Sequence, residues 1–109
     1  MKCICLKLIS GEELIGMVDS ESDCHFNITD PVKISPGYDT EGNFGIRLFS
    51  FMSYCEENLF TFTKKDVMMY SSPTKEMMKY YQDYLCRRSD FNDDELDIDM
   101  YEVQSKSLH

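Results

Sequence analysis

Short segments in which apolar and polar side chains alternate constrain this chain more than any other feature. In the first of them, Cys3–Ile9, every second side chain is apolar, which is the period of a β-strand with one buried face. A turn at Ser10–Glu13 separates it from a second segment, Leu14–Val18. Gly16 in the middle of that segment suits a sharp bend or a close backbone approach better than a flat sheet. Strong curvature predicts a small, bent barrel.

Further strands follow along the chain. Phe26 and Ile28 face one side of a third strand, while His25, Asn27 and Thr29 face the other. Asp30-Pro31 interrupts this strand, because proline cannot donate to a ladder, and Val32–Ile34 continue it at an edge or a bulge. The remaining predicted elements are a loop at Ser35–Asn43, a hairpin made of Phe44–Tyr54 and Leu59–Thr63, a turn at Lys64–Asp66 and a last strand at Val67–Tyr70.

A helix is predicted at about 73–86. Ser72 supplies a capping hydroxyl, and Pro73 suits the first helical position. An apolar stripe at helical spacing predicts packing on the barrel or on a neighbouring subunit, most simply across an open barrel end. The stripe consists of Met77, Tyr81, Tyr84 and Leu85.

The C-terminal segment 89–109 is acidic. It holds seven acidic residues against the single Lys106, hence -6 of the total charge of -9. Too little apolar surface remains there to offset the entropy of ordering, so we expect disorder, with Leu96, Ile98 and Met100 as a candidate binding motif. The domain predicted at 1–88 is nearly neutral and can therefore still hold a local basic site.

Length and cysteine usage exclude several classes. A chain of 109 residues fits one domain of marginal stability, which favours self-association. The five cysteines follow no metal or disulfide spacing, and no cleavable apolar segment opens the sequence, so we expect a reducing cytoplasm and neither a metal nor another cofactor. No apolar run approaches the roughly 18 residues that cross a bilayer, so no membrane partner is expected.

The sequence shows no combination of residues that is typical of a catalytic site. The two histidines, His25 and His109, have no nucleophile at a diagnostic spacing, and the adjacent Cys24 points to the opposite face of its strand from His25. Cys3 and Cys5 share a strand face, but two thiols alone are weak support for zinc and fit a half-buried structural pair better. The chain is therefore predicted not to be an enzyme.

Two stretches, Leu8–Val18 and Asp23–Ile28, resemble the first sequence motif of the Sm-like (LSm) family. Gly11 and Gly16 keep the glycine spacing of that motif, and Asp23, His25, Phe26 and Asn27 keep the order of its second half, one residue further from Gly16. Up to about Leu85 the chain also resembles small Sm-like proteins of marine bacteriophages (cyanophages). The resemblance implies an Sm-like, SH3-like barrel of five to six antiparallel strands, assembled into a homo-oligomeric ring.

The family's base-binding role, carried over, assigns stacking to His25 and hydrogen bonding to Asn27. The second family motif falls on Thr63–Asp66, where Lys64 and Lys65 replace Arg-Gly and can still neutralise phosphate. The resemblance implies a ring that binds single-stranded RNA or DNA, with a role in RNA or DNA processing or regulation. Two alternatives remain. In the first, His25, Asn27, Lys64 and Lys65 face solvent without binding a ligand. In the second, the barrel is a phage protein-interaction or assembly module that binds a protein through its edges or acidic tail and does not bind nucleic acid. The tail is also a candidate competitor for Lys64 and Lys65.

Overall fold

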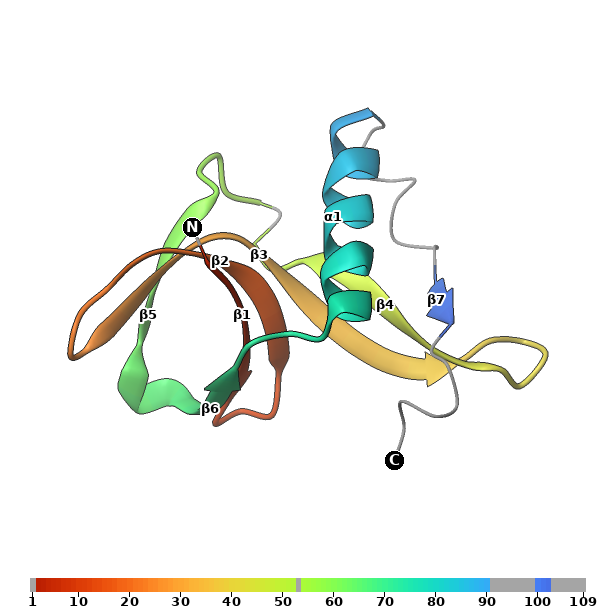
Figure 1. The fold of residues 1–109 in the computed structure, drawn as a ribbon, viewed down its shortest axis with the longest axis horizontal. Coiled ribbons are helices and arrows are strands. Elements are labelled where there is room, and N and C mark those ends of the chain that lie inside the picture. The colour runs from red at the N-terminus through yellow and green to blue at the C-terminus, as the bar shows by residue number, and fades with distance from the viewer. Residues whose placement is uncertain (1, 53, 91–99, 103–109) are drawn as a thin grey trace.

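The computed structural model describes residues 2–52, 54–90 and 100–102. It confirms a mainly β fold of antiparallel strands with one C-terminal helix (Figure 1). In chain order the elements are β1 (Lys2–Leu8), β2 (Glu13–Glu21), β3 (His25–Tyr38), β4 (Phe44–Ser50), β5 (Leu59–Thr63), a 3-10 turn η1 (Lys64–Asp66), β6 (Val67–Ser71), α1 (Lys75–Asp90) and β7 (Met100–Glu102).

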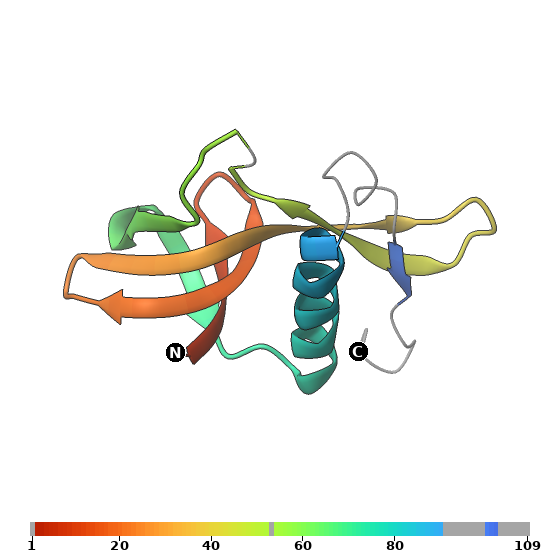
Figure 2. The same cartoon turned by 90° about the horizontal axis from the view of Figure 1, so that it is seen from above.

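The sheet is organised around the long strand β3. Its strand order is β6-β1-β2-β3-β4-β7, and β5 also pairs with β3. The first part of β3, His25–Thr29, pairs with β5, and the last part, Val32–Tyr38, pairs with β4. As Figure 2 shows, the β3–β4 pair extends away from the rolled part of the sheet as an arm.

Two sequence-based predictions are wrong in this arm. β4 and β5 do not form a hairpin with each other, because each pairs with a different part of β3. Ser35–Tyr38, expected in a loop, continues β3 opposite β4. Pairing between β2 and β3 ends at Ile34, so Pro36 has a ladder on one side only, and proline is tolerated there.

A one-residue bulge divides β3. Between Ile15 and Met17 of β2, β3 runs from Val32 to Thr29 and therefore holds one residue more. Asp30 has a φ of 50°, a left-handed conformation that aspartate adopts more readily than most residues. Of the edge or bulge predicted at Asp30-Pro31, the structure shows a bulge, and β3 continues through both residues instead of being interrupted. The bulge turns the apolar side chains before and after it to opposite faces of the sheet.

The first core lies inside the rolled part of the sheet. Gly16 is required there, because a Cβ atom at this position would lie 2.4 Å from Cγ2 of Ile28. The close backbone approach predicted at Gly16 is confirmed, and Gly11 serves the β1–β2 turn with a φ of 98°. The buried residues of this barrel core are Ile4, Leu6, Phe26 and Ile28, with Val18, Phe62 and Val67 packed against them.

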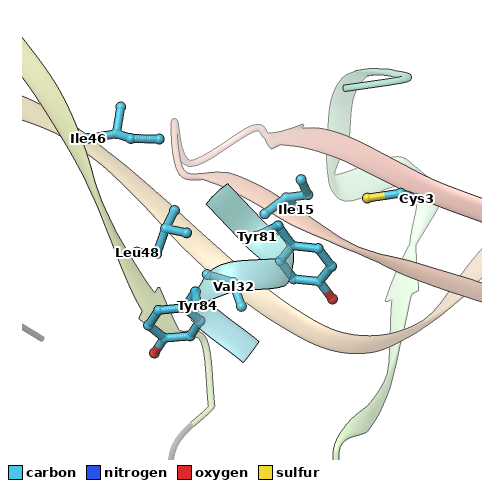
Figure 3. Packing of buried hydrophobic residues seen from close by; sticks show 7 residues of the cluster. All are labelled: Cys3, Ile15, Val32, Ile46, Leu48, Tyr81 and Tyr84. Atoms are coloured by element: carbon cyan, nitrogen blue, oxygen red, sulfur yellow. The ribbon is translucent and has the colours of Figure 1, made fainter. Parts of the chain in front are cut away.

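The second core lies between α1 and the opposite face of the strands (Figure 3). The predicted stripe of α1 does face the sheet, but α1 covers the outer face of β1 to β4 and not an open barrel end. The bulge causes this difference, because it turns Val32 and Ile34 out of the barrel and leaves an apolar face to be covered. This helix core consists of Cys3, Ile15, Val32, Ile46, Leu48, Tyr81 and Tyr84, with Cys5, Met17, Ile34, Met77, Met78, Tyr80 and Leu85 around them.

Both ends of α1 differ from the prediction. The capping residue is Thr74, whose Oγ1 accepts a hydrogen bond of 3.1 Å from the amide of Met77, and not Ser72. Pro73 consequently precedes the cap instead of opening the helix, which runs to Asp90. Most of the predicted disordered tail, residues 91–99 and 103–109, lies outside the described residues, whereas Met100–Glu102 pair with β4. Within the described part of the chain, no helix combines the length and apolarity that a membrane crossing needs.

Candidate nucleic-acid interface

Pairing between β3 and β5 gathers the predicted binding residues at one end of the barrel. His25 lies opposite Thr63 and Asn27 lies opposite Thr61 in this antiparallel pair. Lys64 follows directly, and its amide donates a 2.8 Å hydrogen bond to the carbonyl of Cys24. The two segments predicted separately as family motifs are therefore neighbours in space.

The turn before β3 holds His25 in place. Oγ of Ser22 accepts hydrogen bonds from the amides of Cys24, at 3.3 Å, and His25, at 3.1 Å, while the Ser22 amide donates to the His25 carbonyl at 2.9 Å. The side chain of His25 is exposed, whereas the next residue, Phe26, is fully buried in the barrel core. The predicted face assignment of the third strand is confirmed, and the imidazole is open to a ligand.

Asn27 is the centre of a polar chain across three strands. Its Nδ2 donates to Oγ of Ser20 on β2 at 2.8 Å, and its Oδ1 accepts from Oγ1 of Thr61 on β5 at 2.7 Å. A primary amide has two N–H groups and an oxygen with two lone pairs, so one donor and one acceptor site remain after these bonds. The two internal bonds orient the amide, and the remaining pair can recognise a nucleobase edge.

Lys64 already has an anionic partner. Its Nζ donates to Oε2 of Glu21 at 2.6 Å and lies 4.8 Å from the centroid of the Phe26 ring. The hydrogen bond to Glu21 is the main reason that the pKa of Lys64 is raised, with smaller contributions from the charges of Tyr70 and Asp23. The side chains of Lys64 and Glu21 are 25% and 47% exposed, so solvent weakens this pair and a phosphate can reach the ammonium group. Lys65 lies on the same turn and is exposed.

Several residues of this surface were not predicted from the sequence. Ser20, Glu21 and Thr61 reach it through cross-strand register, which no local spacing encodes. Tyr70 comes from β6, which pairs with β1, and its ring packs edge-on against Phe26 at a centroid distance of 4.9 Å. The motif spacing identified the long side chains but not the partners that orient them.

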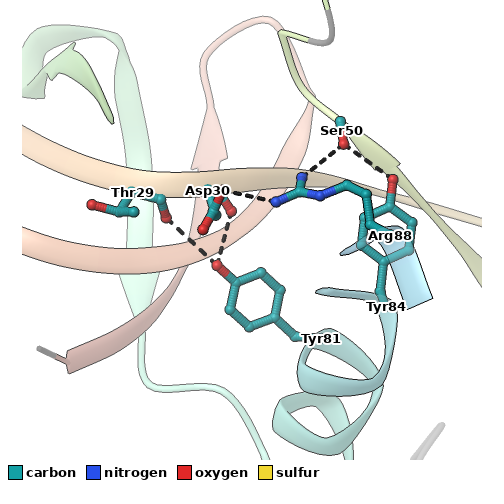
Figure 4. Close-up of polar contacts among 6 residues, drawn as sticks. All are labelled: Thr29, Asp30, Ser50, Tyr81, Tyr84 and Arg88. Carbon is teal, nitrogen blue, oxygen red and sulfur yellow. Dashed lines mark hydrogen bonds and ion pairs between the residues drawn. The ribbon is translucent and has the colours of Figure 1, made fainter. Parts of the chain in front are cut away.

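A second polar cluster joins α1 to the bulge of β3 (Figure 4). Arg88 donates through Nη2 to Oδ1 of Asp30 at 2.8 Å and through Nη1 to Oγ of Ser50 at 2.9 Å. The Tyr81 hydroxyl donates to the Asp30 carbonyl at 2.8 Å, and Tyr84 shares a 3.2 Å hydrogen bond with Ser50. Burial is the main reason that the pKa of Tyr81 is raised. These groups hydrogen-bond one another, so the cluster is a structural joint between α1 and the bulge, and its Asp30, Ser50 and Arg88 also line a pocket together with Phe60 of β5.

The thiols of Cys3 and Cys5 lie in the helix core, as expected for a structural pair. Burial raises the pKa of Cys3, and it raises that of Cys5 to about 11, so both are protonated at neutral pH and are poor nucleophiles. Among the described residues, no group of three or more His, Cys, Asp or Glu side chains is placed to hold a metal ion.

Comparison with known protein families identifies the domain to which most of this chain is similar. The model of the Sm-like domain matches residues 5–82, which is more than half of the chain and includes His25, Asn27, Lys64 and Lys65. A comparison with curated proteins finds no match.

Proposed function

This chain belongs to the Sm-like family, and we propose that it is a non-enzymatic ring protein that binds single-stranded RNA through the barrel end formed by β3 and β5. The observation that carries the proposal is the convergence there of a flat ring, an oriented amide and an ammonium group: His25, Asn27 and Lys64. We further propose that the protein acts in the cytoplasm, in RNA processing or regulation, and that it is encoded by a bacteriophage.

Each side chain supports one part of single-strand recognition. The exposed imidazole of His25 offers a face on which an unpaired base stacks. Asn27 offers its remaining donor and acceptor to the edge of that base. Lys64 and Lys65 neutralise the backbone phosphate, so binding should weaken steeply as salt is raised.

The sheet edges support assembly into a ring. Among the described strands, β5 pairs only with β3, and β6 only with β1, so each has one free edge. Large apolar side chains are exposed at these edges, namely Leu59 on β5 and Met68, Met69 and Tyr70 on β6. Pairing of β5 from one subunit with β6 of the next would cover them and would repeat the binding residues around one opening.

Binding is tested by fluorescence anisotropy with labelled 15-mers of U and of A, as RNA and as DNA, in low and moderate salt. We expect the RNA to bind in low salt, and a His25→Ala/Asn27→Ala variant to bind at least about 10-fold more weakly, as expected for the loss of one stacked and hydrogen-bonded base. Lys64→Ala should also weaken binding, whereas Lys79→Ala, which removes the same charge from the exposed face of α1, should not. The proposal would be rejected if none of the four oligonucleotides bound. If the DNA oligonucleotides bound more tightly than the RNA ones, the ligand would be single-stranded DNA and not RNA.

Ring formation is tested separately by native mass spectrometry of the full chain. A closed ring predicts one discrete homo-oligomer that persists on dilution. A monomer would reject the ring without affecting the anisotropy result.

The Glu21–Lys64 ion pair supports a second candidate function, a protein-interaction or assembly module that no longer binds nucleic acid. In that case the carboxylate of Glu21 has taken the place of the phosphate permanently. A pull-down that recovers a protein partner resistant to nuclease, together with lack of binding in the anisotropy assay, would favour this candidate.

A further inference from the structure

The outer edge of β4 carries a short strand from the C-terminal segment. Met100, Tyr101 and Glu102 of β7 pair antiparallel with Arg47, Ile46 and Gly45. β7 covers three of the seven residues of β4, and nine residues connect its start to the end of α1. A pairing of three residues opens at low cost, and nine residues of chain are long enough for β7 to reach another molecule.

We propose that the β4 edge is a strand-docking site that binds the C-terminal segment of a second copy of this chain, and that the chain's own β7 competes for the same edge. Exchange of an identical element between copies needs no new interface, since the two pairings use the same contacts. The inference does not depend on nucleic-acid binding, because the β4 edge and the β3–β5 barrel end lie at opposite ends of β3.

The arm that presents this edge is held in one conformation. β3 and β4 are paired without interruption from Val32–Ser50 to Tyr38–Phe44. At the tip, Oδ1 of Asp39 accepts hydrogen bonds from the amides of Glu41 and Asn43, both at 2.8 Å. The inner face of β4 is fixed by packing on α1 in the helix core. A preordered edge loses little conformational entropy when a strand docks on it.

Charge and sequence pattern match between the edge and the docking segment. β4 presents the exposed Arg47, which lies opposite Met100 in the pairing. In the sequence, Asp97 and Asp99 come just before Met100, and they alternate with the apolar Leu96 and Ile98. Alternation of this kind is the pattern of an extended strand, and it gives a function to the candidate binding motif.

The test uses a fluorescent peptide of residues 95–105 and the full-length chain. In an antiparallel ladder every second amide points to the partner strand, so Tyr101→Pro together with Glu102→Pro must remove at least one ladder hydrogen bond from β7. We expect this variant to bind the peptide at least 10-fold more tightly than the wild-type chain, whose tethered β7 competes at high effective concentration. A chain with Ser105→Pro and Lys106→Pro should behave like the wild type.

Changes in the peptide provide the complementary control, because they leave the protein unaltered. Peptide with the Tyr101→Pro/Glu102→Pro change should not bind, and peptide with Asp97→Asn and Asp99→Asn should bind several-fold more weakly. Hydrogen exchange of β4 should quicken in the protein variant at Gly45–Arg47 and slow again when the peptide is added. Equal affinity for wild-type and variant chains, or equal binding of a peptide whose Leu96, Ile98 and Met100 are replaced by serine, would overturn the proposal.

Discussion

The two halves of β3 have the same backbone conformation but hold their polar groups in different ways. Before the bulge, the polar side chains form a loose surface in which His25 is exposed and Asn27 and Lys64 keep partial access to solvent. At the bulge, Arg88 donates to both Asp30 and Ser50, so these polar groups are bonded to one another, although the side chain of Arg88 is as exposed as that of Lys64, at 25%. The difference indicates that one half is built to exchange partners and the other to hold the fold together.

The bulge makes this division possible. One extra residue reverses the side-chain alternation, so the apolar residues of the first half fill the barrel while those of the second half face α1. If the interpretation is right, substitutions near the bulge should reduce stability, and substitutions at the barrel end should change binding at constant stability.

The largest effect is expected at Gly16, where the backbone of β2 crosses the bulge. Gly16→Ala places a Cβ 2.4 Å from Cγ2 of Ile28, with the carbonyl of Thr29 at 3.3 Å, and should lower the free energy of unfolding by about 3 kcal/mol. Urea unfolding followed by circular dichroism measures it. In a double-mutant cycle, Ile28→Ala removes the methyl group against which the new Cβ would clash. The double variant should therefore lose less free energy of unfolding than the sum of the losses in the two single variants. Strict additivity would show that the contact is not the cause.

The next largest effect is expected for Arg88→Ala. It leaves the partly buried carboxylate of Asp30 without its charged donor and removes a guanidinium group that lies 5.9 Å from the Tyr84 ring centroid. We expect a loss of about 2 kcal/mol in the free energy of unfolding. Lys79→Ala removes the same charge from the exposed face of the same helix and should cost less than about 0.5 kcal/mol. RNA affinity should be unchanged in both variants, and a loss of affinity in Arg88→Ala would remove the distinction between the two halves.

A smaller stability effect is expected for Tyr81→Phe. The hydroxyl of this residue, which is 2% exposed, donates to the carbonyl of Asp30 at the bulge, and its removal should cost about 1 kcal/mol in urea unfolding. Tyr84→Phe is the matched control, because Oγ of Ser50 keeps its bond from Arg88 when the Tyr84 hydroxyl is lost. An equal or larger loss in Tyr84→Phe would indicate that the joint depends on Ser50 and not on the bulge.

Sequence patterns predicted the first half of β3 better than the second. The alternation around Phe26 and Ile28 gave the correct faces, since a period of two is local information. The position of α1 was not predictable in the same way, because the sequence left both an edge and a bulge open at Asp30-Pro31. Only a bulge places Ile28 and Val32, which are an even number of residues apart, on opposite faces. The prediction of a loop at Ser35–Tyr38 is wrong for a related reason, because no local pattern shows that pairing between β2 and β3 ends at Ile34.

The candidate site was predictable only in its outline. His25, Asn27 and Lys64 were identified from motif spacing, and the structure brings them together through β3–β5 pairing. The partners Glu21 and Tyr70 depend on register and on closure of the barrel, which the sequence does not specify locally. Competition of the acidic tail for Lys64 stays a prediction, because residues 91–99 and 103–109 lie outside the described residues, and the carboxylate that pairs with Lys64 in the structure belongs to Glu21 of β2.

The smallest effect, and the one that bears most directly on the binding half, is expected for Glu21→Gln. The substitution keeps the size of the side chain, frees the ammonium group of Lys64 from its 2.6 Å partner and removes a negative charge that repels phosphate. RNA affinity should rise by about 2- to 5-fold in low salt, with the gain shrinking as salt is raised, because exposed charges are screened. Glu13→Gln, an exposed carboxylate at the opposite end of β2, makes the same change in net charge and should leave affinity nearly unaltered. An equal gain in affinity from both variants would mean that RNA binding depends only on the net charge of the protein. No gain in affinity from Glu21→Gln would mean that Lys64 does not contact the phosphate backbone.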